Sequence, residues 1–252
     1  MKRREMIKKT GAALLGASVA GLPAFASDKG NDNRTASTKK KVVVLGAHPD
    51  DPESCAGGTM VMMRKAGYEV VSMYMTKGEA GIKGKSHDEA ATIRKAEAEN
   101  ACKVMGVRPV FLTQIDGSSE INKERYAEVK EALAAENPDI VITHWPIDSH
   151  PDHRVCASLA YDAWRRLGYT FELYYFEAMT GLQSQGFHPT DYVDITEAAA
   201  TKREACFCHV SQDPEGWVDD WHGGMSKFRG REFGVEHAEA FFHLCRYKSD
   251  LL

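Results

Sequence analysis

Short apolar runs alternate with longer amphipathic stretches along most of the chain after residue 40. Runs rich in Val, Ile, Tyr and Phe predict strands, here at 42–46, 70–76, 110–112, 139–144 and 172–176. A less regular run at 192–195 is compatible with one further strand.

Between these runs, apolar residues recur at helical spacing and predict helices over 88–105, 122–136 and 153–167. Ser86, with Glu89 three residues later, matches a capping box at the start of the first helix. After Gln212 the pattern becomes irregular. Its Trp and Gly residues indicate loops or a lid, followed by a final helix or strand around 236–246.

Regular alternation of strand and helix predicts right-handed crossovers between parallel strands. The sequence therefore predicts a single α/β domain over residues 41–252, with a Rossmann-like, mostly parallel sheet and helices on both faces. In open sheets of this kind, ligands bind at the carboxyl ends of the strands.

Residues 1–26 have the features of a signal peptide. They contain the twin-arginine segment Lys2-Arg3-Arg4, a weakly apolar stretch at 11–23 and a small-x-small site at Ala24–Ala26. The apolar stretch is too short to span a membrane, so cleavage is favoured over an uncleaved anchor. Residues 27–40 are polar and predict a flexible leader. We therefore expect an exported, periplasmic protein without stable membrane insertion after cleavage.

The balance of charge narrows the classes of partner. The whole chain carries 32 basic and 36 acidic residues, and the part after residue 26 carries 27 and 35, a net charge of −8. An acidic chain without a basic stripe argues against nucleic acid or anionic membranes as partners. The six cysteines have no framework-like spacing, so buried free thiols are favoured, although sequence does not settle their pairing.

A histidine–aspartate cluster directly follows the first predicted strand, in the segment Ala47-His48-Pro49-Asp50-Asp51-Pro52-Glu53. Pro49 suits a tight turn at the start of a helix. His48 and Asp51 can then converge while Asp50 points elsewhere, so that one acid binds a metal and the other accepts a proton from water. The alternative is a pair of N-capping aspartates beside a packed histidine.

A second cluster, His150-Pro151-Asp152-His153, follows the predicted strand at 139–144. One imidazole can bind a metal while the other stabilises negative charge on a carbonyl oxygen, with Asp152 fixing its tautomer. One such tetrapeptide is also compatible with a surface loop. Two of them at equivalent edges of the sheet favour a shared site with two nitrogens, one oxygen and an open position, which is how a catalytic zinc is usually held.

Residues 41–60 (KVVVLGAHPDDPESCAGGTM) and 139–153 (DIVITHWPIDSHPDH) closely resemble the PIG-L (LmbE-like) superfamily of zinc-dependent N-acetyl-sugar deacetylases. The resemblance covers essentially all of 41–245, and the paired AHPDD and HPDH motifs are its specific part. It implies three zinc ligands: His48, Asp51 and His153. It also implies that Asp50 is the general base, and that His150, tuned by Asp152, steadies the oxyanion or protonates the leaving amine.

The resemblance also places Arg94 and Asp116 near the sugar. Each has a structural alternative: Arg94 with Glu97 is equally a helix-surface or sheet-capping ion pair, and Asp116-Gly117 is equally a turn. Two departures leave substrate choice open. The segment 145–149 lacks the tyrosine that some members have there, and the tryptophan-rich stretch 217–221 is not a family motif.

The sequence thus predicts a zinc-dependent hydrolase that removes acetyl from an N-acetylglucosamine-type sugar, with iron(II) also compatible with these ligands. Alternatives are hydrolysis of a bulkier amino-sugar amide and a non-catalytic carbohydrate-binding protein. A nucleotide-binding Rossmann protein is disfavoured because G-x-G-x-x-G is missing after the first strand. Oligomeric state cannot be read from the sequence.

Overall fold

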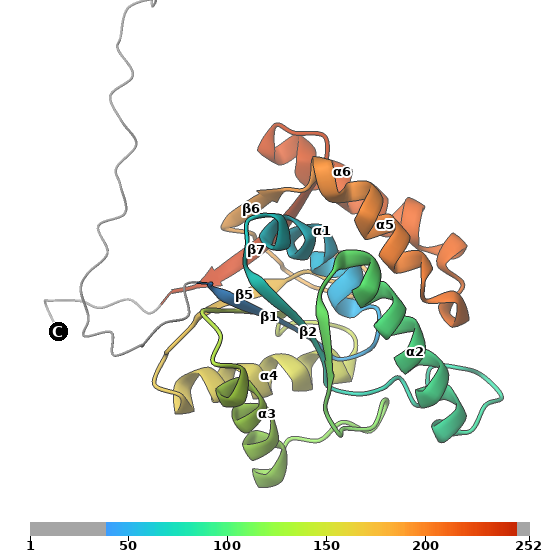
Figure 1. Cartoon of the computed structure of the whole chain (residues 1–252), viewed down its shortest axis with the longest axis vertical. Coiled ribbons are helices and arrows are strands. Elements are labelled where there is room, and N and C mark those ends of the chain that lie inside the picture. Colours follow the sequence, from blue (N-terminus) through green and yellow to red (C-terminus); the bar gives the residue numbers. More distant parts are fainter. Residues whose placement is uncertain (1–38, 246–252) are drawn as a thin grey trace, which may run out of the picture. The chain divides into compact units, whose positions relative to one another are not determined.

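The computed structural model describes residues 39–245, which form an α/β unit built on a seven-stranded sheet (Figure 1). Five strands run parallel in the order β3-β2-β1-β4-β5, and β7 pairs antiparallel with β5 and with the edge strand β6. The strands are β1 (Lys41–Gly46), β2 (Glu69–Tyr74), β3 (Arg108–Phe111), β4 (Ile140–His144), β5 (Glu172–Phe176), β6 (Asp191–Asp194) and β7 (Ala238–Leu244).

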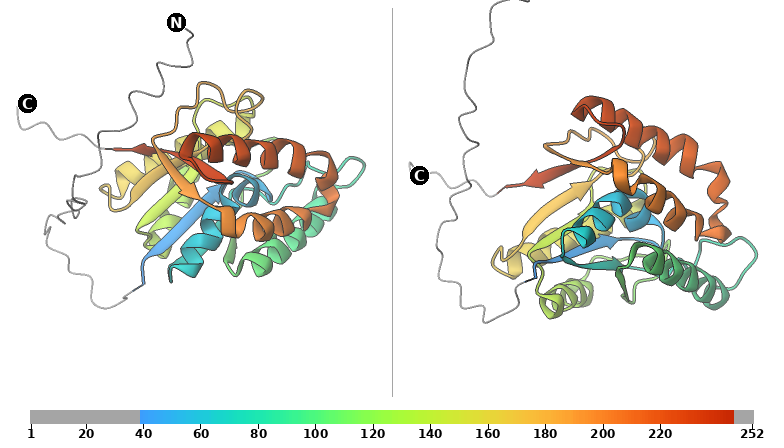
Figure 2. Two further views of the ribbon diagram at one scale, coloured as in Figure 1. Left: turned by 90° about the horizontal axis from the view of Figure 1, so that it is seen from above. Right: turned by 45° about the horizontal axis from the view of Figure 1, so that its top comes forward.

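Helices cover both faces of the sheet (Figure 2). Helices α3 and α4 pack together on one face, and α1, α2 and α5 pack together on the other. The helices are α1 (Asp51–Lys65), α2 (His87–Met105), α3 (Lys123–Glu136), α4 (Pro151–Arg166), α5 (Ala199–Phe207) and α6 (Gly224–Phe233). Short 3₁₀ turns η1 (Thr196–Ala198), η2 (Val210–Gln212) and η3 (Pro214–Gly216) and a π-helix, η4 (Val218–Gly223), connect the later elements.

Strand β1 is buried on both faces, which explains its uninterrupted apolar run. Val43 and Leu45 belong to the core beneath α3 and α4, whereas Val42 and Val44 belong to the core beneath α1, α2 and α5. A parallel strand covered by helices on both sides is apolar at successive positions rather than at every second one. The central strand is thereby fixed between two hydrophobic layers.

The predicted fold class is confirmed, and so is the predicted capping box. The Ser86 hydroxyl accepts the backbone N–H of Glu89 (3.3 Å), and the Glu89 carboxylate accepts the backbone N–H of Ser86 (3.0 Å). The region after Gln212 is more regular than its pattern indicates, because it contains η4 and α6. The last element, β7, is a strand that pairs antiparallel with its neighbours.

The order of the strands places one crevice at the centre of the sheet. From β1 the chain proceeds outward through β2 to β3, and then returns to the other side of β1 as β4. Ligands of open α/β sheets bind at such a reversal, outside the carboxyl ends of the strands. Both histidine–aspartate clusters follow strands at this point, one after β1 and one after β4.

Some expectations fall beyond this description. The predicted signal peptide (1–26), most of the leader (27–40) and the export that they imply lie outside the described residues. Within residues 39–245, no helix combines the length and apolar character that crossing a membrane requires. The six cysteines are free thiols, four of them buried.

Candidate active site

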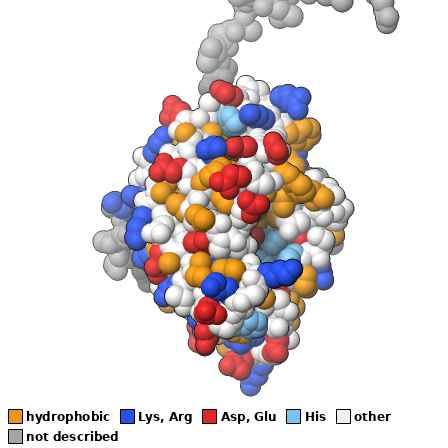
Figure 3. Space-filling model, turned by 90° about the vertical axis from the view of Figure 1, so that its right-hand side faces the viewer, with side chains coloured by type: hydrophobic (Ala, Val, Ile, Leu, Met, Phe, Trp, Pro, Cys, Tyr) orange, Lys and Arg blue, Asp and Glu red, His pale blue; other side chains and the backbone are white. Residues whose placement is uncertain are grey.

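A cavity of about 550 Å³ opens beside the carboxyl ends of β1 and β4. A hollow with histidine side chains inside it is visible on the face shown in Figure 3. Seven of the eight residues predicted for the site line the cavity: His48, Asp50, Asp51, Arg94, Asp116, His150 and His153. The eighth, Asp152, is buried directly behind it and contacts His48.

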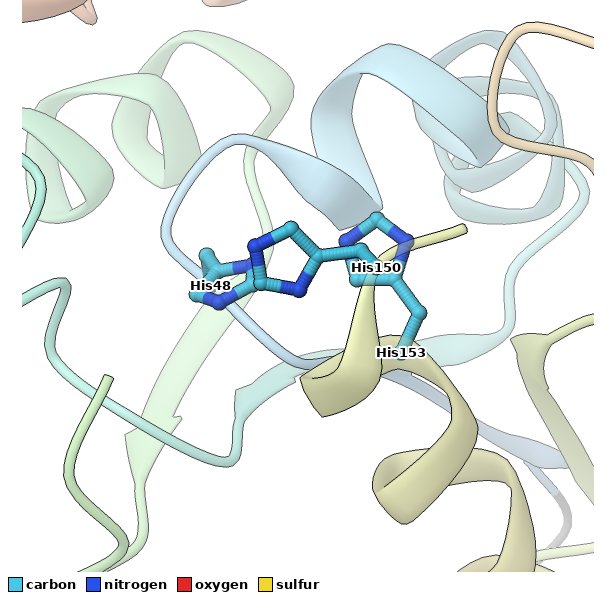
Figure 4. A group of neighbouring side chains, drawn as sticks. All are labelled: His48, His150 and His153. Atoms are coloured by element: carbon cyan, nitrogen blue, oxygen red, sulfur yellow. The ribbon is translucent and has the colours of Figure 1, made fainter. Parts of the chain in front are cut away.

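The three predicted metal ligands lie together. Nδ1 of His48 is 3.2 Å from Oδ2 of Asp51, and Nε2 of His153 is 3.4 Å from Oδ1 of the same carboxylate. The rings of His48, His150 and His153 also gather at one point (Figure 4), and one nitrogen from each lies within 4.8 Å of the others. Two segments about a hundred residues apart thus meet around a single carboxylate.

Carboxylate oxygens lie close to the far nitrogen of each of the two predicted ligand histidines. Nε2 of His48 lies 3.1 Å from Oδ1 of Asp116 and 3.1 Å from Oδ2 of Asp152. Nδ1 of His153 lies 3.2 Å from Oδ1 of Asp148. Histidines that bind metals are usually oriented by such an outer carboxylate, which sets the tautomer and presents the other nitrogen to the ion.

Asp51 is buried, and two neighbouring imidazoles favour the ionised form of its carboxyl. Burial alone would raise the pKa of its carboxyl, but the imidazoles of His153 and His144 hold that pKa well below its usual range. His144, fully buried at the end of β4, places Nε2 3.1 Å from Oδ2 of Asp51, and the same nitrogen accepts the backbone N–H of Ala47 (3.0 Å). The backbone N–H of His48 donates to the same oxygen (2.7 Å).

This donor set fits a divalent metal ion. Two imidazole nitrogens and an ionised carboxylate face one another in a buried place, where unpaired charge is costly. Burial opposes protonation of His153, yet the Asp51 and Asp148 carboxylates raise its pKa to about 9. Protons and a metal ion compete for such nitrogens. The residues present therefore suit zinc, and iron(II) is compatible with the same ligands.

Asp50 has an unusual backbone conformation immediately before α1. Its φ is 106° and its ψ is −29°, in the left-handed region that side chains rarely adopt. Arg94 stabilises this turn: its Nη2 donates to Oδ2 of Asp50 (2.7 Å) and to the carbonyl oxygen of Pro49. Burial, partly offset by Arg94, raises the pKa of Asp50 to about 6. A carboxylate poised in this range suits proton transfer near neutral pH.

Arg94 is not a helix-surface residue. Its side chain is 4% exposed, whereas Glu97, the alternative partner, accepts hydrogen bonds from Ser211 instead. The loop after β2 leaves space for the guanidinium, because a Cβ at Gly78 or Gly81 would lie within 2.6 Å of Arg94 atoms. The arginine is therefore built into the wall of the cavity beside Asp50.

His150 presents a hydrogen-bond donor to the cavity. It is the N-cap of α4, and its Nδ1 accepts the backbone N–H of Asp152 (3.2 Å). Burial, and then the neighbouring His48 and His153, lower the pKa of His150, which favours the neutral ring. A neutral imidazole whose Nδ1 is an acceptor carries its proton on Nε2. We assign that tautomer to His150.

Asp152 occupies a different place from the one that the sequence predicts. The resemblance implies that Asp152 tunes His150, but its carboxylate contacts His48 and accepts the backbone N–H of Gly117 (2.8 Å). Only the backbone of Asp152 reaches the His150 ring. Asp116 is more than a turn residue, because it is buried against His48 at the cavity wall.

Sequence reasoning missed three residues of the site. Asp148 is buried, accepts the backbone N–H of His150 (2.8 Å) and lies against His153. The feature of the sequence that could have identified Asp148 is an acidic residue two positions before His150. Trp217 and His222 line the cavity from the region around η4, which has no motif that would indicate it.

Comparison with known proteins agrees with this geometry. Residues 43–164 match the family model described as PIG-L, GlcNAc-PI de-N-acetylase. Residues 43–164 therefore carry a PIG-L family domain. This matched region includes both histidine–aspartate clusters and ends within α4.

Several relatives are named deacetylases. The chain is 28% identical to diacetylchitobiose deacetylase of Thermococcus kodakarensis, over 82% of this chain and 87% of that protein. It is 27% identical to a probable N-acetyl-alpha-D-glucosaminyl L-malate deacetylase 2 of Bacillus subtilis, over 69% and 84%. The structure of N,N'-diacetylchitobiose deacetylase from Pyrococcus horikoshii superposes with a TM-score of 0.72 at 26% identity, covering 82% and 84%. These comparisons confirm the prediction of an amide-hydrolysing enzyme of the deacetylase class.

Proposed function

We propose that this protein is a zinc-dependent hydrolase that removes the acetyl group from an N-acetylglucosamine-type sugar and releases acetate. The observation on which the proposal rests is that His48 and His153 both contact the Asp51 carboxylate, with Asp50 and His150 in the same cavity. The names of the relatives support a sugar amide as substrate.

The residues divide the chemistry between them. His48, Asp51 and His153 would hold the metal, which when bound supplies Lewis acidity that polarises a carbonyl and acidifies water. The Asp50 carboxylate takes the proton of the attacking water, and Arg94 keeps that carboxylate in place. The Nε2–H of His150 donates to the carbonyl oxygen as negative charge develops there.

The remaining steps return the proton. As the C–N bond of the tetrahedral intermediate breaks, the proton held on Asp50 moves to the leaving nitrogen, and acetate and a free amine result. Asp152 and Asp148 would act on the reaction by orienting the two ligand histidines, and Asp116, which also contacts His48, lines the cavity where the sugar would bind.

Export would bear on the choice of substrate. If residues 1–26 direct the chain across the inner membrane, scavenged or cell-wall-derived N-acetylglucosamine compounds are better candidates than intermediates of intracellular thiol synthesis. Fractionation of cells that express the full chain, with mass spectrometry of the mature N-terminus, tests the predicted export and cleavage.

Acetate release tests the proposal directly. The metal-loaded protein is incubated with a panel of N-acetylated sugars, and acetate and free amine are both quantified. We expect equal amounts of the two products, no release after chelation, and recovery when zinc is added back. Absence of acetate from every sugar would contradict the proposal.

A second candidate is hydrolysis of a bulkier amide in an amino-sugar conjugate. The observation that favours it is a second cavity of about 360 Å³ beside α5 and α6, which shares His222 with the active-site cavity. A narrow space of about 20 Å³, lined by Cys55, Lys202 and His222, adjoins both. Hydrolysis of large conjugates without any release of acetate from simple sugars would select this candidate.

A further inference from the structure

One wall of the active-site cavity comes from a segment beyond the matched family region. Gln212 and Trp217 lie on this wall, the first at the end of η2 and the second immediately before η4. The family model ends at residue 164, so neither residue belongs to the part that defines the chemistry. We call residues 211–217 the aromatic wall.

Hydrogen bonds fix the tryptophan in this wall. The indole Nε1–H of Trp217 donates to the carbonyl oxygen of Gln212 (2.9 Å), and the Gln212 amide nitrogen donates to the carbonyl oxygen of Gly81 (3.2 Å). His222 packs edge-to-face against the indole, with ring centroids 5.4 Å apart. The ring is therefore held before any ligand enters.

Hydrogen bonds also connect the aromatic wall to α2, the helix whose Arg94 bonds the proposed base Asp50. The backbone N–H and the hydroxyl of Ser211 donate to the two oxygens of Glu97, each at 2.7 Å. Glu97 lies on α2 one turn after Arg94, which bonds Asp50. Through α2, the position of Trp217 is set relative to Asp50.

The remaining chemistry of Trp217 is apolar. Because its only donor is already used, the indole offers a ligand the carbon surface of the ring. Asp50, Arg94 and His150, all polar, line the same cavity. A pyranose has C–H groups that project from the faces of its ring and hydroxyls at its edge, so an N-acetylated sugar can place its amide at these polar groups and one ring face on the indole.

We propose that Trp217 stacks on the ring of the amino sugar and determines a preference for cyclic amino sugars over acyclic N-acetyl amines. This inference rests on the proposed deacetylase function and names the residue that recognises the substrate. Trp217 acts here in specificity and has no role in proton transfer.

Kinetics of matched tryptophan variants test the proposal. Trp221, on the π-helix η4 that follows Trp217, is 45% exposed and does not line the cavity, so Trp221→Ala is the control. Loss of a stacked aromatic contact is worth on the order of a tenfold change in binding. We expect Trp217→Ala to raise KM for N-acetylglucosamine by about this factor and to lower kcat little. The ratio of kcat/KM for N-acetylglucosamine to kcat/KM for 2-acetamidoethanol should fall by the same factor.

Trp217→Phe should restore most of the affinity, because phenylalanine retains an aromatic face, and Trp221→Ala should match the wild type. An unchanged KM in Trp217→Ala would overturn the proposal. So would an equal loss of activity on the sugar and on 2-acetamidoethanol, since that pattern indicates a general structural defect.

Fluorescence provides a readout that does not depend on turnover. Trp221→Phe leaves three tryptophans: Trp217 in the cavity, and Trp145 and Trp164, which are both buried. Titrating the chelated Trp221→Phe protein with N-acetylglucosamine should give a saturable change that the Trp217→Phe/Trp221→Phe protein lacks. A change that persists in the double variant would contradict stacking on Trp217. Saturable binding together with no acetate release by the metal-loaded protein would instead retain stacking and reject the proposed reaction.

Discussion

The two halves of the domain contribute different things to the same cavity. Residues 41–166, from β1 to α4, supply every group assigned here to metal binding and proton transfer. Residues after 166 supply the antiparallel edge of the sheet and the aromatic wall. The difference teaches that the chemistry depends on a few groups at the centre of a parallel sheet, whereas the shape of the substrate site depends on elements added beside it.

The largest expected effect separates chemistry from metal binding within the first half. Asp50→Asn removes the base but retains a residue that tolerates a positive φ. We expect kcat to fall by about 10²–10⁴, with metal content unchanged by elemental analysis. Asn137→Asp is the control, since Asn137 also has a positive φ (48°) but is exposed at the end of α3 and does not line the cavity. Robust acetate release by Asp50→Asn would show that Asp50 is not the general base.

The next prediction concerns the connection between the halves. Lys202 of α5 donates to Glu239 of β7 (2.6 Å), and Glu239 also accepts the backbone N–H groups of Gly58 and Thr59 in α1. Glu239→Gln would leave a buried ammonium without its counter-charge, at a cost of about 3–5 kcal/mol in the free energy of unfolding. Urea denaturation measures this change.

Glu236→Gln provides the control for this substitution, because Glu236 is exposed near the start of the same strand. Its stability should match the wild type. If Glu239→Gln unfolds at the wild-type urea concentration, the buried pair does not hold the halves together.

A third prediction returns to the first half and tests the donor on His150. His150→Ala should lower kcat by about 10²–10³, the usual effect of losing one oxyanion donor, while metal content stays near wild type. His87→Ala, at an exposed helix start, is the control. Loss of metal from His150→Ala would show that the roles of His150 and His153 have been exchanged.

The smallest effect is expected for the residue that orients a ligand. Asp148→Asn weakens the contact with Nδ1 of His153 and should reduce metal affinity by about 10–100-fold, as outer-shell changes usually do. Competition with a chelating dye measures the affinity, with the surface variant Asp220→Asn for comparison. Unchanged affinity would mean that packing alone orients His153.

The sequence was most informative where its signals are local. Apolar runs predicted the parallel strands, and helical spacing predicted the helices between them. The i, i+3 clusters at 48–51 and 150–153 predicted which side chains would lie together. All these signals depend on residues that are close in the sequence. The partner of Asp152 was not predictable, since it depends on how side chains from two remote loops face each other. The helix α6 and the π-helix η4 were also missed, because glycines interrupt a short segment whose packing stabilises it.

The backbone at Asp50 restricts which amino acids this position can hold through evolution. Few residues other than glycine, asparagine and aspartate adopt a positive φ readily, and of these three only aspartate can accept and release a proton near neutral pH. The amino acid at position 50 is therefore restricted by backbone conformation and, independently, by proton transfer. A library randomised at position 50 should recover aspartate alone under selection for growth on the substrate, and glycine and asparagine as well as aspartate under selection for folding.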